Sequence, residues 1–370
     1  MDQNPWANSG RFDVPAGQQT SSHNQNQTQG NTNNYQSYTQ NYNQIYNQNY
    51  RDLSALKKQQ DKKQLKKISL YSGGALLLVV LIQYVFVIAL AVVGKLDLYR
   101  DNELFQSSFD IILTVFGTLL PFMLMGRKIK KASGELNPVP VGRPTGVIDF
   151  LLAVVAGVGV CFAANIVTSI VMVVMALFGL EPSAPEIAMP DGVLGVTLSF
   201  VRIAIVAGVV EELSLRGYVM GNLRKYGDTF AILMSALVFG IMHGNLIQTP
   251  FAIVAGIGLG YFSVKTNSLW TGIVIHIINN GVSVFFSYLY DYLPEETVNI
   301  VYFILLGGTI FLGLVALLIF CLRTKERKLR KNQSSLSFGE AVRCYLLSPT
   351  MIVSMLYMIY VTTLFISEIE

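Results

Sequence analysis

The stretch 193–220 reads VLGVTLSFVRIAIVAGVVEELSLRGYVM, and it decides the kind of fold that this chain adopts. It is apolar over a length that crosses a bilayer, yet it carries two adjacent acids, Glu211 and Glu212. Ionisable groups at membrane depth are costly unless they are paired or hydrated, so they indicate function by default. Two of the three histidines, His243 and His276, also lie in apolar stretches. Carboxylates and imidazoles in a dry compartment are the groups from which water-activating hydrolases are built.

The composition places the chain among polytopic helical membrane proteins. Hydrophobic residues make up 52% of the sequence and charged residues only 14%, which is too apolar for a soluble protein of 370 residues. We predict an all-α fold of about eight transmembrane helices, with a weaker ninth run that adds a crossing if it spans. The eight runs cover residues 68–94, 105–126, 147–179, 193–220, 229–246, 251–264, 268–290 and 298–322, and the ninth covers 344–367.

Five segments follow from these runs and from the composition between them. Residues 1–50 are rich in Asn, Gln and Tyr, cannot bury a core and are predicted to form a disordered cytoplasmic tail. Residues 51–67 are predicted to form a basic juxtamembrane helix that contacts anionic lipid. The segment 68–145 holds the first two transmembrane helices and a basic loop. The core that carries the polar constellation covers 146–290, and 291–370 holds the last transmembrane helix, a basic segment and the apolar tail.

Basic residues alternate between successive connections, which predicts an orientation. The N-terminal flank, the loop Arg127–Arg143, the turn Arg224–Lys225, Lys265 and the tail Arg323–Lys331 hold most of them. The connections in between are mixed, acidic or uncharged. Because basic connections stay in the cytoplasm, we predict an integral protein of the cell membrane with a cytoplasmic N-terminus and both ends of the eight-helix core in the cytoplasm. No nucleic-acid partner is predicted.

Helical geometry separates the two acids. Glu212 and Arg216 are one helical turn apart with the acid first, which is the favourable order for an ion pair. Glu211 is rotated by about 100° from Glu212 and faces another direction. We therefore expect Arg216 to neutralise Glu212, and Glu211 to point into the bundle without a full counter-ion, as a general base or acid requires.

Two further pairs lie on the following apolar runs. Phe239 and His243 share one run, and a helical hairpin about the preceding turn would return His243 to the depth of Glu211. His276 and Asn280 are one helical turn apart and share a face. Together they can donate hydrogen bonds to a developing oxyanion or hold a metal-bound water.

Each of these features also has a structural interpretation. A lone His in a membrane helix more often hydrogen-bonds to a neighbouring helix than catalyses, and a Glu–Arg pair one turn apart is usually structural. A Glu pair, two His and an Asn on three neighbouring runs are less easily explained in this way. Asp110 and Arg202, two other charges inside apolar runs, have no evident partner in the sequence and are interpreted as structural or pore-facing.

Together the motifs resemble the signature of the CPBP intramembrane proteases. Glu211-Glu212-x-x-x-Arg216, Phe239-x-x-x-His243 and His276-x-x-x-Asn280 agree with it in order, spacing and placement on successive apolar runs, over roughly residues 145–290. The family includes the type II CAAX prenyl endopeptidases and the bacteriocin-processing Abi proteins. The resemblance implies an eight-helix membrane endopeptidase whose site lies inside the bundle and opens toward the cytoplasmic leaflet.

The resemblance also implies a role for each motif residue. Glu211 would activate the attacking water together with His243, while His276 and Asn280 would stabilise the oxyanion or a metal. The supporting residues would be Glu212, Arg216 and Phe239. Glu211, His243 and His276 could ligate zinc, which would make the protein a metalloprotease, but they lack the His-x-x-x-His spacing of a zinc site on one helix.

Three functions are compatible with these observations. The leading hypothesis is an endopeptidase that hydrolyses a membrane-associated polypeptide, and prenylated CAAX tails are the substrates that resemblance to one branch of the family implies. The first alternative is a non-catalytic immunity or scaffold protein that keeps the fold and binds a partner. The second is a transporter that uses the buried acids and histidines as a proton relay.

Overall fold

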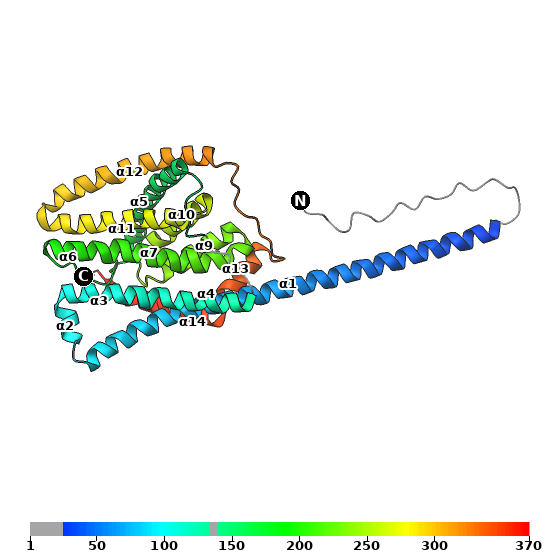
Figure 1. Ribbon diagram of the computed structural model, residues 1–370, viewed down its shortest axis with the longest axis horizontal. Helices are drawn as coiled ribbons and strands as arrows, with labels where there is room; N and C mark the ends of the chain where they lie inside the picture. Colours follow the sequence, from blue (N-terminus) through cyan, green and yellow to red (C-terminus); the bar gives the residue numbers. More distant parts are fainter. Residues whose placement is uncertain (1–24, 134–139, 370) are drawn as a thin grey trace. The chain divides into compact units, whose positions relative to one another are not determined.

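The computed structural model describes residues 25–133 and 140–369, and nearly all of this part is helical (Figure 1). The predicted all-α fold of a polytopic membrane protein is confirmed. The chain divides into two units, Met1–Leu56 and Lys57–Glu370. Residues 1–24 of the predicted tail and 134–139 of the predicted basic loop lie outside the described residues.

Helix α1 (Gln25–Val92) includes the predicted basic helix 51–67 and the second half of the predicted disordered tail. Side chains 40–56 are exposed, so this segment buries no core, as its composition predicts. Its backbone is nevertheless helical, which differs from the expected disorder. A helix extends more easily than it starts, because each added residue contributes a hydrogen bond without a new nucleus.

Six helical stretches of the described residues are long and apolar enough to cross a membrane. A seventh arises if α13 (Phe338–Leu346) and α14 (Pro349–Thr363), which meet at 72°, count as one bent span. Helix α2 (Leu96–Asp101) joins the first two stretches. The six comprise part of α1; α3 (Glu103–Leu113) with η1 (Thr114–Leu119) and α4 (Leu120–Ser133); α5 (Val147–Leu177); the composite helix Gly192–Tyr226; α11 (Leu269–Tyr292); and α12 (Glu295–Arg323).

The two remaining predicted runs give shorter helices. Residues 229–246 contribute α9 (Asp228–Ile241), and residues 251–264 lie in α10 (Thr249–Thr266). A turn joins them, in which Gly244 takes a positive φ of 63° and the Asn245 side chain accepts from the Gln248 backbone N–H at 2.8 Å. By length and composition the described residues therefore supply six or seven crossings, plus this helical hairpin, where the sequence predicts about eight crossings.

The composite helix holds Glu211 and Glu212 between two π-helical segments. Helix α7, which ends with Glu211 and Glu212, is preceded by η2 and followed by η3, and both of these are π-helical. Such widened turns are common at functional sites, because they redirect side chains without ending the helix. In chain order the parts are α6 (Gly192–Ser199), η2 (Phe200–Val206), α7 (Ala207–Glu212), η3 (Leu213–Met220), α8 (Gly221–Leu223) and η4 (Arg224–Tyr226).

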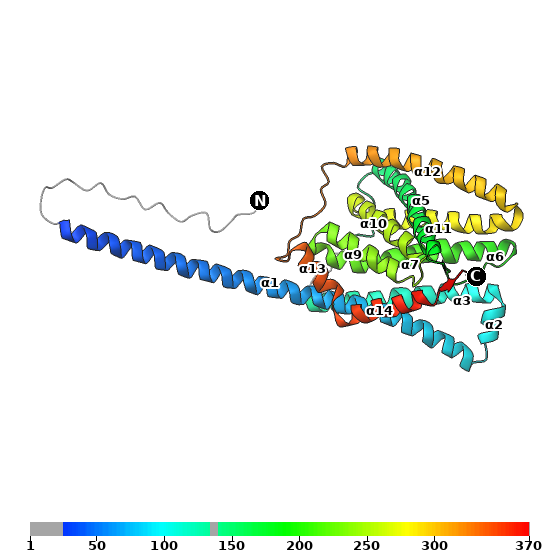
Figure 2. The same ribbon diagram turned by 180° about the vertical axis from the view of Figure 1, so that it is seen from behind.

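Glycines allow α10 to pack closely against α9 and α5 (Figure 2). A Cβ added at Gly256 would lie 3.1 Å from Cβ of Ala236 in α9, and one at Gly258 would lie 2.9 Å from the Val160 side chain in α5. Small residues let helix backbones approach in this way inside membranes. The Gly-rich run is therefore a site of close helix packing.

The connections predicted to be cytoplasmic meet at one end of the second unit, which we call the basic end. Lys225 Nζ lies 2.9 Å from an Asp61 carboxylate oxygen. Lys265 Nζ donates to the carbonyls of Thr324 and Arg327 at 2.8 and 2.7 Å. The basic turn therefore contacts the N-terminal flank, and the end of α10 contacts the tail after α12. The tail also contacts the turn, since the Gln333 backbone N–H donates to the Lys225 carbonyl at 3.0 Å.

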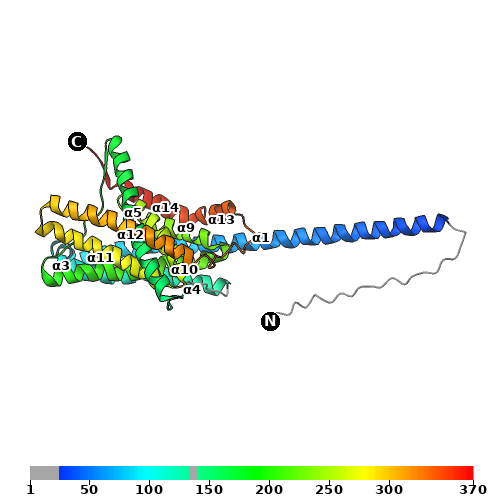
Figure 3. The same cartoon turned by 90° about the horizontal axis from the view of Figure 1, so that it is seen from above.

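The opposite end, which we call the acidic end, is defined by the connections 180–191 and 291–296. There β1 (Leu180–Pro182) pairs antiparallel with β2 (Ile366–Glu368). Helix α13 contacts the basic end through the Lys58–Glu340 ion pair at 2.8 Å. The ninth apolar run thus extends from the basic end toward the acidic end, and α14 lies beside α9 (Figure 3).

Candidate active site

Glu212 and Arg216 form an ion pair in the interior of the bundle, as their spacing predicts. Arg216 Nη1 lies 2.7 Å from Glu212 Oε1, and neither side chain has any exposed surface. Arg216 also donates to the Gly256 carbonyl at 3.2 Å, and its Cζ lies 4.5 Å from the centre of the Phe239 ring. The pair therefore connects the composite helix to α9 and α10.

The imidazole of His276 lies between the two acids of the composite helix. Its Nδ1 is 3.1 Å from Glu212 Oε1, and its Nε2 is 3.6 Å from Glu211 Oε2. A carboxylate only accepts hydrogen bonds, so the Nδ1 proton points at Glu212. This ring therefore connects Glu211 to the buried Glu212–Arg216 pair. Sequence spacing predicts His276 beside Asn280 but gives no sign of a ring held by two carboxylates.

Phe239 and His243 complete the aromatic wall of the site. The Phe239 ring contacts both imidazoles edge-on, with centroid distances of 5.0 Å to His243 and 5.7 Å to His276. Nδ1 of His243 lies 2.7 Å from the Phe239 carbonyl oxygen and must therefore donate to it. In a neutral ring this bond leaves Nε2 of His243 as an acceptor that can take a proton from water.

Asn280 is held by its neighbours on the cavity wall. Its side-chain NH₂ donates to the Ile203 carbonyl at 2.9 Å, and its side-chain oxygen accepts from Asn279 at 3.1 Å. Both asparagines line the cavity, although helical spacing favours Asn280 alone. The second N–H of the Asn280 amide remains available for an oxyanion.

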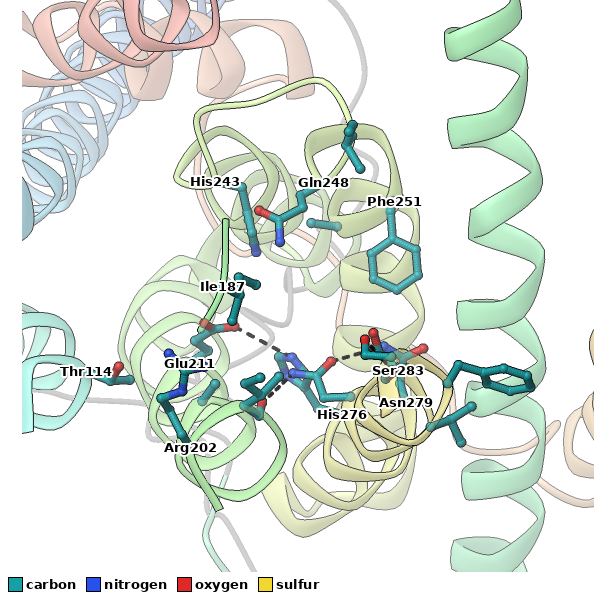
Figure 4. A pocket seen from close by; sticks show the side chains of 18 of the residues that line it. Thr114, Ile187, Arg202, Glu211, His243, Gln248, Phe251, His276, Asn279 and Ser283 are labelled. Carbon is teal, nitrogen blue, oxygen red and sulfur yellow. Dashed lines mark hydrogen bonds and ion pairs between the residues drawn. The ribbon is translucent and has the colours of Figure 1, made fainter. Parts of the chain in front are cut away.

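A cavity of about 780 Å³ brings these groups together (Figure 4). Glu211 has 18% of its side chain exposed, whereas Glu212 and Arg216 are buried beside it. A carboxylate with access to water, next to a fully buried pair, is the division of roles that the sequence predicts. Predicted residues that line the cavity are Glu211, Phe239, His243, His276 and Asn280.

Asp110 and Arg202, which have no evident partner in the sequence, pair with each other on the wall of the same cavity. Arg202 Nη1 lies 2.7 Å from Asp110 Oδ2, and its other terminal nitrogen donates to the Ala188 carbonyl. Tyr99 donates to the second Asp110 oxygen at 2.8 Å. Only the fold brings together two residues so far apart in the chain, so sequence spacing gave no signal for this pair.

The residues proposed as zinc ligands do not fit a three-ligand site in this structure. Among the described residues no group of three or more His, Cys, Asp or Glu side chains is placed to hold a metal ion. His243 uses Nδ1 on the Phe239 carbonyl, and His276 turns each ring nitrogen toward a carboxylate.

The cavity runs from Glu211 toward the acidic end. Ile187, in the connection after β1, lines it, as do Ser283, Ser287 and Tyr290 in the last turns of α11. The resemblance implies an opening toward the cytoplasmic leaflet, while the count of basic residues places the basic end in the cytoplasm. The direction of the cavity means that these two expectations cannot both hold.

Comparison with known proteins agrees with the motifs. Residues 193–282 match the family model described as type II CAAX prenyl endopeptidase Rce1-like, and every residue predicted for the site lies within this segment. The fold and the match define a polytopic membrane protein with an Rce1-like domain. The resemblance to the CPBP intramembrane proteases is confirmed.

A curated relative points to the same class. The chain is similar to a Bacillus subtilis (strain 168) protein named "Putative membrane peptidase YdiL", with 23% identity over 184 residues that make up 49% of this chain and 72% of that protein. No solved structure matches the chain significantly. Both matches support a protease of the membrane, without naming its substrate or its mechanism.

Proposed function

We propose that this protein is an intramembrane endopeptidase that hydrolyses a peptide bond of a membrane-associated polypeptide. The observation that carries the proposal is the convergence of Glu211, His243 and His276 on one cavity, with the Glu212–Arg216 pair buried beside it. The prediction of basic connections in the cytoplasm extends the proposal to a cytoplasmic N-terminus and to contact of segment 51–67 with anionic lipid.

The proposed reaction begins with a water molecule between Glu211 and Nε2 of His243. One of these groups accepts a proton as the water oxygen forms a bond to the peptide carbonyl carbon. The carbonyl oxygen gains negative charge, and the free N–H of Asn280 can donate to it, as can Nε2–H of His276 when that ring carries both protons. The stored proton then passes to the amide nitrogen as the carbon–nitrogen bond breaks, which leaves a carboxylic acid and an amine.

The supporting residues set the position of Glu211. His276 contacts Glu211 on one side and Glu212 on the other, and Arg216 holds Glu212. Buried, connected charges of this kind keep their geometry, because each partner would be left unpaired by a shift of the other. Glu211 can therefore stay aligned while its own carboxylate has access to water.

Cleavage by the purified protein in lipid vesicles tests the proposal. We expect it to cut members of a library of single-span membrane peptides, with the new termini identified by mass spectrometry. We expect no detectable cleavage by the Glu211→Gln variant. The same vesicles carry an internal pH dye. A pH-dependent flux without any cut peptide would instead support the proton-relay transporter and would contradict the proposal.

A second prediction concerns the space beside Glu212. A Cβ added at Gly272 would lie 2.7 Å from Glu212 Oε2 and 2.6 Å from Ser263 Oγ, so Gly272→Ala displaces the carboxylate. We expect the cleavage rate to fall about 10²-fold, because shifts of roughly 1 Å in a catalytic arrangement have effects of that size. Gly308→Ala is the matched control, since an added Cβ there meets nothing within 4 Å. Equal rates for the two variants would show that the position of Glu212 does not matter.

A further inference from the structure

The path by which a substrate reaches Glu211 is decided by which side of the site is packed. Two paths along the composite helix could lead to Glu211, one from each end. At a rise of about 1.5 Å per residue, the path from Lys225 at the basic end is about 21 Å long and the path from Gly192 at the acidic end is about 28 Å long. The shorter path is closed. Leu215, Val219 and Met220, which follow Glu211 on the composite helix, are 0% exposed.

The longer path is open. On the composite helix, cavity-lining residues precede Glu211 toward the acidic end, and on α11 they follow His276 toward the same end. Tyr290 is 45% exposed and Ile187 is 50% exposed at the mouth. Among the described lining residues none comes from the connections of the basic end. Water and substrate therefore meet Glu211 from the acidic end.

The two ends differ sharply in charge. The connections 180–191 and 291–296 hold no Lys or Arg, and the connection 95–103, which lies at the same end, holds Lys95 and Arg100 together with the acids Asp97, Asp101 and Glu103. The acids of the first two connections are Glu181, Glu186, Asp191, Asp291, Glu295 and Glu296. The basic end carries Lys and Arg on the N-terminal flank, the turn, α10 and the tail after α12. Because Lys and Arg bias sets the orientation of membrane proteins, the basic end belongs in the cytoplasm and the mouth of the cavity outside it.

The cavity wall suits an uncharged stretch of peptide. Asp110, Arg202 and Glu211 are the charged residues that line it in the described part, and the first two neutralise each other. Most of the other polar groups are amides and hydroxyls, which can pair with the N–H and C=O groups of an extended backbone. They include Asn165, Thr168, Gln248, Asn279, Ser283 and Ser287.

From these observations we infer that the substrate is an uncharged stretch of an unprenylated polypeptide, presented at the extracytoplasmic face and entering the cavity from the acidic end. The inference rests on the proposed function for the cleavage step, but the direction of access stands on the packing and the charge asymmetry alone. Prenylated cytoplasmic tails would have to reach Glu211 through the packed side of the helix bundle.

Single-cysteine labelling tests the direction of access without any need for activity. The background carries Cys161→Ala, Cys321→Ser and Cys344→Ala, and the probe is a membrane-impermeant maleimide applied to right-side-out and inside-out vesicles. We expect Ser283→Cys and Ser287→Cys to react in right-side-out vesicles together with the exposed marker Glu295→Cys. The marker Lys331→Cys, in the exposed tail, should react only in inside-out vesicles. Labelling after SDS gives the total thiol for each variant.

Two results would overturn the inference. One is reaction of the Ser283 and Ser287 variants from the same side as Lys331→Cys. The other is reaction of Glu295→Cys only in inside-out vesicles, which would place the mouth in the cytoplasm.

A comparison of the peptide termini in cells that express the wild type with those in cells that express Glu211→Gln tests the substrate class. We expect the termini lost in the variant to map to extracytoplasmic segments without a prenyl group. Losses confined to cytoplasmic tails would reject the inferred substrate while keeping the protease. If the two kinds of cells contain the same peptide termini and the cysteines in the cavity are labelled as expected, the proposed function is rejected and the direction of access is kept.

Discussion

Replacing Glu211 by Gln is expected to lower the rate of peptide cleavage by about 10³-fold, because loss of a positioned general base has effects of this order. Gln keeps the shape of the side chain and its contact with His276, but it cannot take a proton from water. Glu211 has 18% of its side chain exposed and no Arg or Lys partner within the described residues. The cleavage rate of purified protein in lipid vesicles measures the effect.

The control for this variant is a second acid outside the cavity. Glu295→Gln, at the exposed start of α12, removes the same charge and is expected to leave the rate unchanged. Thermal unfolding of both variants should match the wild type, since neither acid supports the fold. Cleavage by Glu211→Gln at the wild-type rate would remove Glu211 from the reaction and leave its contact with His276 as a structural feature.

Replacing Arg216 by Met is expected to lower the free energy of unfolding by about 3–5 kcal/mol, the usual effect of breaking a buried ion pair. The change leaves Glu212 without its main counter-ion in a position that has no exposed surface. It also removes the bond to the Gly256 carbonyl and the contact with the Phe239 ring. Unfolding by SDS in mixed micelles measures the loss.

A double variant separates charge from packing. Glu212→Gln combined with Arg216→Met removes both charges, so it should recover much of the stability that Arg216→Met loses. Activity should not return, because His276 loses the carboxylate at its Nδ1. A double variant no more stable than Arg216→Met would show that the loss comes from the packing of the Arg216 side chain, and that its charge contributes little.

Local spacing predicts much of the fold and part of the site. The apolar runs give the long helices, and the i,i+4 rule gives the Glu212–Arg216 pair, because both depend on residues close together in the chain. The glycines of α10 predict close packing for a similar reason, since only a missing side chain permits it. The alternation of basic residues correctly groups the connections that meet at the basic end.

Contacts between distant residues are not contained in any local pattern. Asp110 pairs with Arg202, and His276 lies between Glu211 and Glu212, because α3, the composite helix and α11 pack together with these side chains facing one another. The π-helical segments on both sides of α7 contribute to that packing, and no residue type marks them in advance. The direction of the cavity depends on the same packing and could not be derived from the motifs.

The C-terminal run shows the same limit. Its apolar residues and Pro349 leave its path open, whereas in the structure it extends along the bundle and ends as β2, paired with β1. Its residue Val361 lies against Gly244, immediately after His243, so an added Cβ at that glycine would be 3.1 Å from Val361. The tail that the family motifs do not cover thus contacts the turn that carries a candidate catalytic residue.

Whether Glu211 and His243 act on one water is the claim on which this mechanism depends, and a double-mutant cycle on cleavage rates tests it most directly. His243→Asn keeps a donor for the Phe239 carbonyl but removes the acceptor nitrogen. If the two groups work as a unit, Glu211→Gln combined with His243→Asn should be no slower than the more impaired single variant. Rate losses that multiply in the double variant would show that the two side chains act independently, which contradicts the account.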